Sequence, residues 1–225
     1  MMEDKDTFEG VDDDLITRHR MALVKPEKRF EHRLSSGVKV SVWKADLFRF
    51  NEADAVVNAA NTSLSHGGGL AQAGGPQIQQ ESRDYIRKYG SLKTGDAVAL
   101  SAGFLPYKKI IHAVDLLYIP PQIFHDSISE CLWTAASAGH KSISFPAIGT
   151  GNLGFPEKEA ASIMLDAVMQ FSKNCPTSMA VYIVIYHSDQ HNFQVLSHKS
   201  PIEEAILFCN PPNPAMNMVN IKDFS

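Results

Sequence analysis

Short apolar runs alternate with amphipathic stretches between residues 36 and 200, and this alternation constrains the fold more than any other feature of the chain. Val38, Val40 and Val42 are separated by polar residues, as in a strand with one buried face. The segment 53–57 predicts a second, more fully buried strand. Four further strands are predicted, over residues 96–101, 109–114, 142–148 and 180–186.

Apolar residues at helical spacing occupy the gaps between these strands. One helix is predicted from Pro76 to the residue before Gly90, a second ends near Gly139, and a third begins at Pro156. On the first helix, the predicted buried face carries Ile78, Tyr85, Ile86 and Tyr89. Strands that alternate with helices predict an α/β fold, whose sheet is covered on both faces and binds ligands beyond the carboxyl ends of its strands.

The two ends of the chain lack this alternation. Residues 1–35 begin with an acidic run and then turn basic, and residues 210–214 contain clustered prolines. We therefore expect a flexible leader or linker over 1–35, one domain over 36–200, and a flexible tail or linker over 201–225. A chain of 225 residues suits one domain with tails.

Charge and cysteine content exclude several classes of protein. The 21 basic and 25 acidic residues give a net charge of −4, which argues against duplex nucleic acid as a partner. The longest apolar stretch, residues 179–186, is far below the roughly 18 residues that a membrane span needs. Three widely spaced cysteines indicate neither a disulfide framework nor a zinc site. We expect a protein of the cytoplasm or nucleus that needs no metal and no cofactor.

The strongest local signal for a ligand lies in residues 57–70. A buried strand ends there in small polar residues, Asn61 among them, and His66 is followed by Gly67, Gly68 and Gly69. Three glycines let backbone N–H groups approach a ligand with no side chain in the way, which suits a pyrophosphate. The alternative is an ordinary turn between a strand and a helix, which rarely needs three consecutive glycines.

A second glycine-rich loop, residues 146–156, lies between a predicted strand and the start of a predicted helix. The unpaired N–H groups and partial positive charge of a helix N-terminus stabilise phosphate without a lysine or arginine, so an acidic protein can hold a nucleotide. The pattern of dinucleotide-binding dehydrogenases is also present, as Gly149-Thr150-Gly151-Asn152-Leu153-Gly154. That alternative is the weaker one because the usual acidic residue about 20 residues further on is missing.

In this order, the motifs resemble the macro domain, a family that binds ADP-ribose. The resemblance covers residues 36–195 and rests on Lys44–Leu47, Asp54–Asn61, His66–Leu70, Ala73–Pro76, Ile110–Val114 and Phe145–Gly151. It implies a three-layer α/β/α sandwich around a mixed, mostly parallel sheet. The style is closest to macro domains that occur in tandem in BAL-type ADP-ribosyltransferases, which implies one module of a longer architecture.

The resemblance also implies a role for each matching residue. Asp46, with Leu47 beside it, matches the acidic residue that accepts a hydrogen bond from the adenine amino group. Asn61 matches the asparagine beside the distal ribose, whereas Asn58 is expected to tie loops together. The loop around the distal ribose and diphosphate is matched by Gly67, Gly68 and Gly69, and the second phosphate loop by Gly149, Thr150, Gly151, Asn152 and Leu153.

The function that the resemblance implies is binding of ADP-ribose, free or as mono-ADP-ribose on proteins, by a monomeric domain. One alternative is slow hydrolysis of ADP-ribosyl esters on acidic side chains, with Asn61 and His66 as the catalytic pair. Hydrolytic members with an Asp after the glycine loop differ from this chain, which has Leu70 there. A third possibility is a scaffold without ligand, because the segment from Leu70 to Ala73 is about one helical turn shorter than in the family and is expected to leave apolar surface uncovered.

Overall fold

The computed structural model describes residues 25–65, 69–114, 119–148, 156–175 and 178–185. Within these residues the strands are β1 (Glu27–Arg33), β2 (Lys39–Lys44), β3 (Ala55–Ala60), β4 (Ala97–Ser101), β5 (Lys109–Val114), β6 (Ser142–Phe145) and β7 (Ala180–Ile185). The helices are α2 (Gly69–Ala73), α3 (Pro76–Tyr89), α4 (Pro121–Ser137) and α5 (Glu157–Asn174). None of the described helices is long and apolar enough to cross a membrane.

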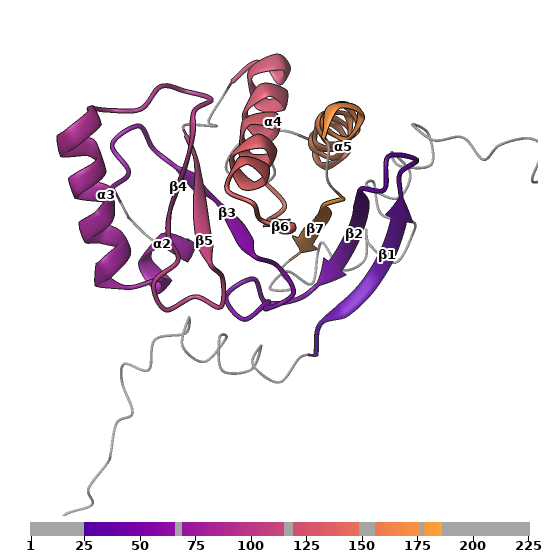
Figure 1. Cartoon of the computed structure of the whole chain (residues 1–225), viewed down its shortest axis with the longest axis horizontal. Coiled ribbons are helices and arrows are strands. Elements are labelled where there is room, and N and C mark those ends of the chain that lie inside the picture. Colours follow the sequence, from indigo (N-terminus) through magenta and orange to yellow (C-terminus); the bar gives the residue numbers. More distant parts are fainter. Residues whose placement is uncertain (1–24, 66–68, 115–118, 149–155, 176–177, 186–225) are drawn as a thin grey trace, which may run out of the picture.

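One mixed sheet organises the molecule (Figure 1). The strand order is β1-β2-β7-β6-β3-β5-β4, and the five central strands are parallel. The edge strands β1 and β4 run antiparallel to their neighbours β2 and β5. The prediction of a mixed, mostly parallel sheet is confirmed.

Side chains on the two faces of this sheet build two separate cores. Val57 and Ile111 face a core that is completed by α4 and α5. Their neighbours Val56 and Ile110 face the opposite core, which α2, α3 and the segment 45–53 complete. In Figure 1, α4 and α5 accordingly lie together, away from α3. The predicted three-layer α/β/α sandwich is confirmed.

Part of the predicted leader is a strand. The expectation of a flexible segment over 1–35 is wrong for Glu27–Arg33, which pairs with β2 as β1. Its residues are mostly charged, and only Phe30 reaches the core. Charged side chains are typical of edge strands, where they prevent pairing with other chains. The charged residues that predicted a linker therefore belong to an edge strand.

Two other elements differ from prediction in detail. Strand β6 ends at Phe145 rather than at Ile148, because Pro146 has no N–H to donate to a neighbouring strand. Tyr89 is 62% exposed instead of buried, and its ring packs on Tyr85 with centroids 4.8 Å apart. The short helix α2 buries Leu70 and Ala71, so the expected uncovered apolar surface is not found at these residues.

An ionic cluster fastens the amino-terminal ends of β3, β5 and β6. The Asp54 carboxylate accepts hydrogen bonds from Lys108 Nζ at 2.6 Å and from the Lys141 N–H at 2.8 Å. Partial burial raises the pKa of Asp54, but these two hydrogen bonds outweigh it and hold that pKa below its ordinary value. Burial lowers the pKa of the neighbouring His140. The negative charge of Asp54 raises this pKa, whereas the positive charges of Lys108 and Lys109 lower it further.

Both shifts predict a fold that weakens in acid. The unfolded chain takes up a proton at His140 below its ordinary pKa of 6.5 while the folded chain resists, so stability falls as the pH drops below about 6.5. Stability from Asp54 is present above its ordinary pKa of 3.8 and is lost as the pH falls through the lower folded value. Urea unfolding from pH 8 to pH 4 measures the His140 step, and its extension below pH 4 measures the Asp54 step. His140→Gln should flatten the step between pH 7 and 5, and an unchanged step would contradict this assignment.

Candidate functional site

The sheet has a topological switch point between β3 and β6. After β3 the chain continues to β4 and β5 on one side, and after β6 it continues to β7 on the other. β3 and β6 pair at two positions, Ala55↔Ile143 and Val56↔Ser144, whereas β3 and β5 pair along their whole length. Ligands of open α/β sheets bind outside the carboxyl ends of the strands at such a point. The segments that follow β3 and β6 are therefore the centre of the candidate site.

Three of the predicted segments leave the sheet at this same edge. Asp46 follows β2, Pro146 follows β6, and Asn61 follows β3, and these strands are parallel. In the order β2-β7-β6-β3, Asp46 and Asn61 are separated by three strand spacings, or about 14 Å at the usual spacing of about 4.8 Å. The segment after β6 lies between them.

The carboxylate of Asp46 uses one oxygen to shape its own loop. Oδ1 accepts a hydrogen bond from the Phe48 N–H at 2.9 Å, and the Arg49 N–H donates to the Asp46 carbonyl at 3.0 Å. This pattern is an Asx turn. Oδ2 lies 3.8 Å from Nε of Arg49, whose side chain is 60% exposed, and such a pair is weak and screened by solvent. The Asp46 side chain is itself only 9% exposed, and Oδ2 keeps the capacity to accept a further hydrogen bond.

Leu47 is fixed by a contact that sequence reasoning missed. Its side chain is buried, so only its backbone can take part in a site. The Leu47 carbonyl accepts a hydrogen bond of 2.6 Å from the hydroxyl of Tyr107, which comes from the loop before β5. Burial raises the pKa of Tyr107 far above its ordinary value, so this hydroxyl keeps its proton and donates it. Tyr107 thus holds the loop that carries Asp46.

Asn61 closes a tight loop with its whole side chain. Nδ2 donates to the carbonyl and the Oγ of Ser65 at 3.2 Å and 2.7 Å. Oδ1 accepts from Ser63 Oγ at 3.0 Å and from the Ser65 N–H at 2.9 Å. Leu64 lies between Ser63 and Ser65 with a left-handed backbone, at φ 50°. Its own side chain is buried in the core and holds it there. These hydrogen bonds hold the loop in one conformation. The left-handed backbone of Leu64 is strained, and such strained residues cluster at functional sites.

Asn58 has a different role from the one predicted. Its amide nitrogen lies 3.2 Å from Nδ1 of His112 and donates to the Ala59 carbonyl at 3.0 Å. Asn58 and His112 are also register partners on β3 and β5. Asn58 therefore joins two strands and not loops, and Asn61 is the residue that ties a loop together. His112 is fully buried, as expected of a core histidine.

Several predicted site residues lie outside the described residues. They are His66, Gly67, Gly68, Gly149, Thr150, Gly151, Asn152 and Leu153. Gly69 is described and begins α2 with φ 63°, a left-handed conformation that a side chain would strain. Across the described ranges, no group of three or more His, Cys, Asp and Glu side chains could hold a metal ion.

Comparison with known proteins finds one family. The model of the macro domain family matches residues 57–164. A protein of Enterobacter sp. (strain 638) named O-acetyl-ADP-ribose deacetylase is 38% identical over 153 residues, which are 64% of this chain and 84% of that protein. An uncharacterized protein of Pyrobaculum aerophilum is 37% identical over 69% of this chain and 88% of its own length.

Other matches differ in how much of each protein they cover. An uncharacterized protein of Thermotoga maritima is 34% identical over 79% of this chain, but this chain spans only 31% of its length. The Oceanobacillus iheyensis macrodomain, solved with ADP, superposes with a TM-score of 0.70 at 23% identity, over 83% of this chain and 98% of that one. A variant of the same macrodomain was solved with ADPR.

Proposed function

The chain belongs to the macro domain family, and from this premise we propose that it binds ADP-ribose, free or as mono-ADP-ribose attached to proteins. We place it in the cytoplasm or nucleus as a monomer that needs no metal or cofactor. Asp46 would hold the adenine and the loop Gly149–Leu153 the diphosphate. Gly67–Gly69, together with the loop that Asn61 shapes, would hold the distal ribose.

The order of the segments along the carboxyl edge of the sheet carries this proposal. Asp46, the segment after β6 and Asn61 succeed one another across the strands β2, β6 and β3. Adenine, diphosphate and distal ribose succeed one another in ADP-ribose in the same order. An acceptor at one end, the predicted phosphate loop after β6 and a pre-formed polar loop at the other end support this ligand over a shorter nucleotide.

Thermal unfolding tests the proposal with the whole chain. A ligand that binds only the folded state stabilises it by about 2.7 kcal/mol at 100 times its Kd. The melting temperature should therefore rise with ADP-ribose and should rise less with ATP or NAD at the same concentration. A melting temperature that none of them changes would support the scaffold alternative.

A second candidate function is hydrolysis of an ADP-ribosyl ester, and the relative named O-acetyl-ADP-ribose deacetylase favours it. Water would attack the ester, and the acid of the modified side chain would leave. Asn61 would shape the loop that positions the distal ribose, since its side chain is fully engaged within that loop, and His66 would lie beside the ribose. Because no carboxylate follows the glycine loop at Leu70, the reaction would depend on positioning more than on a strong base and would be slow.

Release of ADP-ribose from a protein modified on acidic side chains separates the two candidates. If the chain is an enzyme, release should exceed the buffer rate and should disappear in Asn61→Ala, which removes four hydrogen bonds of the loop. Asn51→Ala, an exposed asparagine before β3, is the matched control and should retain activity. Release no faster than in buffer would leave binding alone.

A further inference from the structure

The carboxyl-terminal part of α3 forms a distinct surface beside residues 61–65, named the Asn61 loop. The N–H of Leu92 donates to the Thr62 carbonyl at 2.9 Å, and Gly95 and Asp96 form backbone hydrogen bonds with Val114 at the carboxyl end of β5. The segment that follows α3 is therefore fixed to the same edge of the sheet as the candidate site. Five exposed residues here are named the α3 surface: Arg83, Arg87, Lys88, Tyr89 and Lys93. Asp84, Ser91 and Thr94 beside them are exposed as well.

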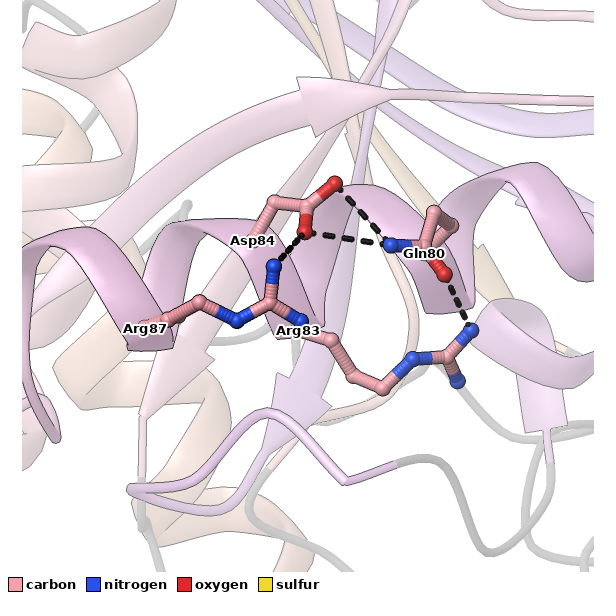
Figure 2. A network of polar contacts seen from close by, with 4 residues as sticks. All are labelled: Gln80, Arg83, Asp84 and Arg87. Atoms are coloured by element: carbon pink, nitrogen blue, oxygen red, sulfur yellow. Dashed lines mark hydrogen bonds and ion pairs between the residues drawn. The ribbon is translucent and has the colours of Figure 1, made fainter.

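This surface is basic in a chain that is acidic overall. From Arg83 to Lys93 there are four basic side chains and one acidic one, a net charge of +3 in a chain of −4. The single acid, Asp84, is already engaged: Gln80 Nε2 donates to both of its oxygens at 3.1 Å, and Arg87 Nη1 donates to one at 2.9 Å (Figure 2). The charges of Arg83, Lys88 and Lys93 are left uncompensated by Asp84.

An exposed tyrosine lies among these charges. Tyr89 is 62% exposed. The centroid of its ring lies 4.8 Å from the centroid of the Tyr85 ring and 4.8 Å from Lys88 Nζ. Tyrosine and arginine are enriched where proteins bind one another. The chain's net charge of −4 argues against a nucleic acid partner, so the surface favours a polypeptide over single-stranded RNA.

We propose that the α3 surface binds an acidic segment of the ADP-ribosylated protein, next to the residue that carries ADP-ribose. The inference rests on the proposed function, because a polypeptide attached to the distal ribose leaves the site beside the Asn61 loop. Carboxylates near the modified residue would pair with Lys88 and Lys93, and Tyr89 would cover the peptide backbone. The substrate class is thus a protein modified within an acidic sequence.

Two mono-ADP-ribosylated peptides test this proposal, one with Glu on both sides of the modified residue and one with Gln in those places. The chain should bind the Glu peptide more tightly, and the advantage should shrink as salt rises from 50 to 300 mM. Lys88→Glu should weaken the Glu peptide about fivefold or more, since it removes an attractive pair and adds repulsion. Tyr89→Ala should weaken both peptides.

The control variant is Lys173→Glu, because Lys173 and Lys88 are both lysines in the last turn of a helix. It should leave both peptides unaffected, and neither variant should change the affinity for free ADP-ribose. Equal binding of the two peptides, with free ADP-ribose still bound, would overturn this inference alone. Tighter binding of single-stranded RNA than of the Glu peptide to the same residues would also overturn it. Failure of the chain to bind free ADP-ribose would overturn the proposed function as well.

Discussion

Gly151→Glu should abolish binding of ADP-ribose, with a loss of at least about 100-fold. Any side chain at this position of the predicted phosphate loop enters space that the diphosphate needs, and a carboxylate also repels it. Like charges brought together in an interface cost several kcal/mol, and every 1.4 kcal/mol is a factor of ten in affinity. Retention on an ADP-ribose resin measures the loss.

The control for this variant is Ser137→Glu, which adds the same charge at the exposed last residue of α4. It should leave retention unchanged. Unchanged retention of Gly151→Glu would show that the predicted phosphate loop is misplaced. A lower melting temperature of Gly151→Glu without ligand would show instead that the glycine is needed for folding.

Asp46→Asn should weaken binding of ADP-ribose by about 10- to 150-fold. An Asn retains an oxygen that can accept the hydrogen bond from the Phe48 N–H, so the Asx turn should survive. It replaces the second oxygen by an NH₂ group, which cannot accept from the adenine amino group. Loss of a hydrogen bond to a charged acceptor costs about 1.5–3 kcal/mol, which gives this range.

Asp96→Asn is the matched control because Asp96 also accepts a backbone hydrogen bond within its own turn, from the Lys93 N–H at 2.8 Å. Calorimetry should find its affinity for ADP-ribose unchanged and that of Asp46→Asn reduced. Asp46→Ala adds a comparison, since it removes both the acceptor and the turn. Equal affinity of Asp46→Asn and the wild type would exclude Asp46 from the site.

The fold could be predicted where the hydrophobic pattern is strong and local. The run from Lys109 to Val114 is a strand over these same residues, and Pro76 begins a helix that ends before Gly90. β1 could not be predicted because its stability comes from pairing with β2, while its own residues are mostly charged. The order of the strands could also not be predicted from the sequence, because it depends on contacts between distant segments.

The site could be predicted less completely than the fold. Family motifs predict Asp46 and Asn61 as site residues, and the parallel strands bring both to one edge of the sheet. The bond from Tyr107 to Leu47 joins residues 60 positions apart and leaves no local pattern to find. The four hydrogen bonds of Asn61 join it to Ser63 and Ser65, and they do not follow the Asx-turn pattern that the sequence could have indicated. The two glycine loops remain predictions.

Calorimetric titration of the whole chain with ADP-ribose tests the central claim most directly. The segments at the carboxyl edge of β2, β6 and β3 predict saturable heat from one site per chain, with weaker heat for ATP and NAD under the same conditions. The absence of saturable heat for ADP-ribose, from protein whose cooperative unfolding shows that it is folded, would contradict the account.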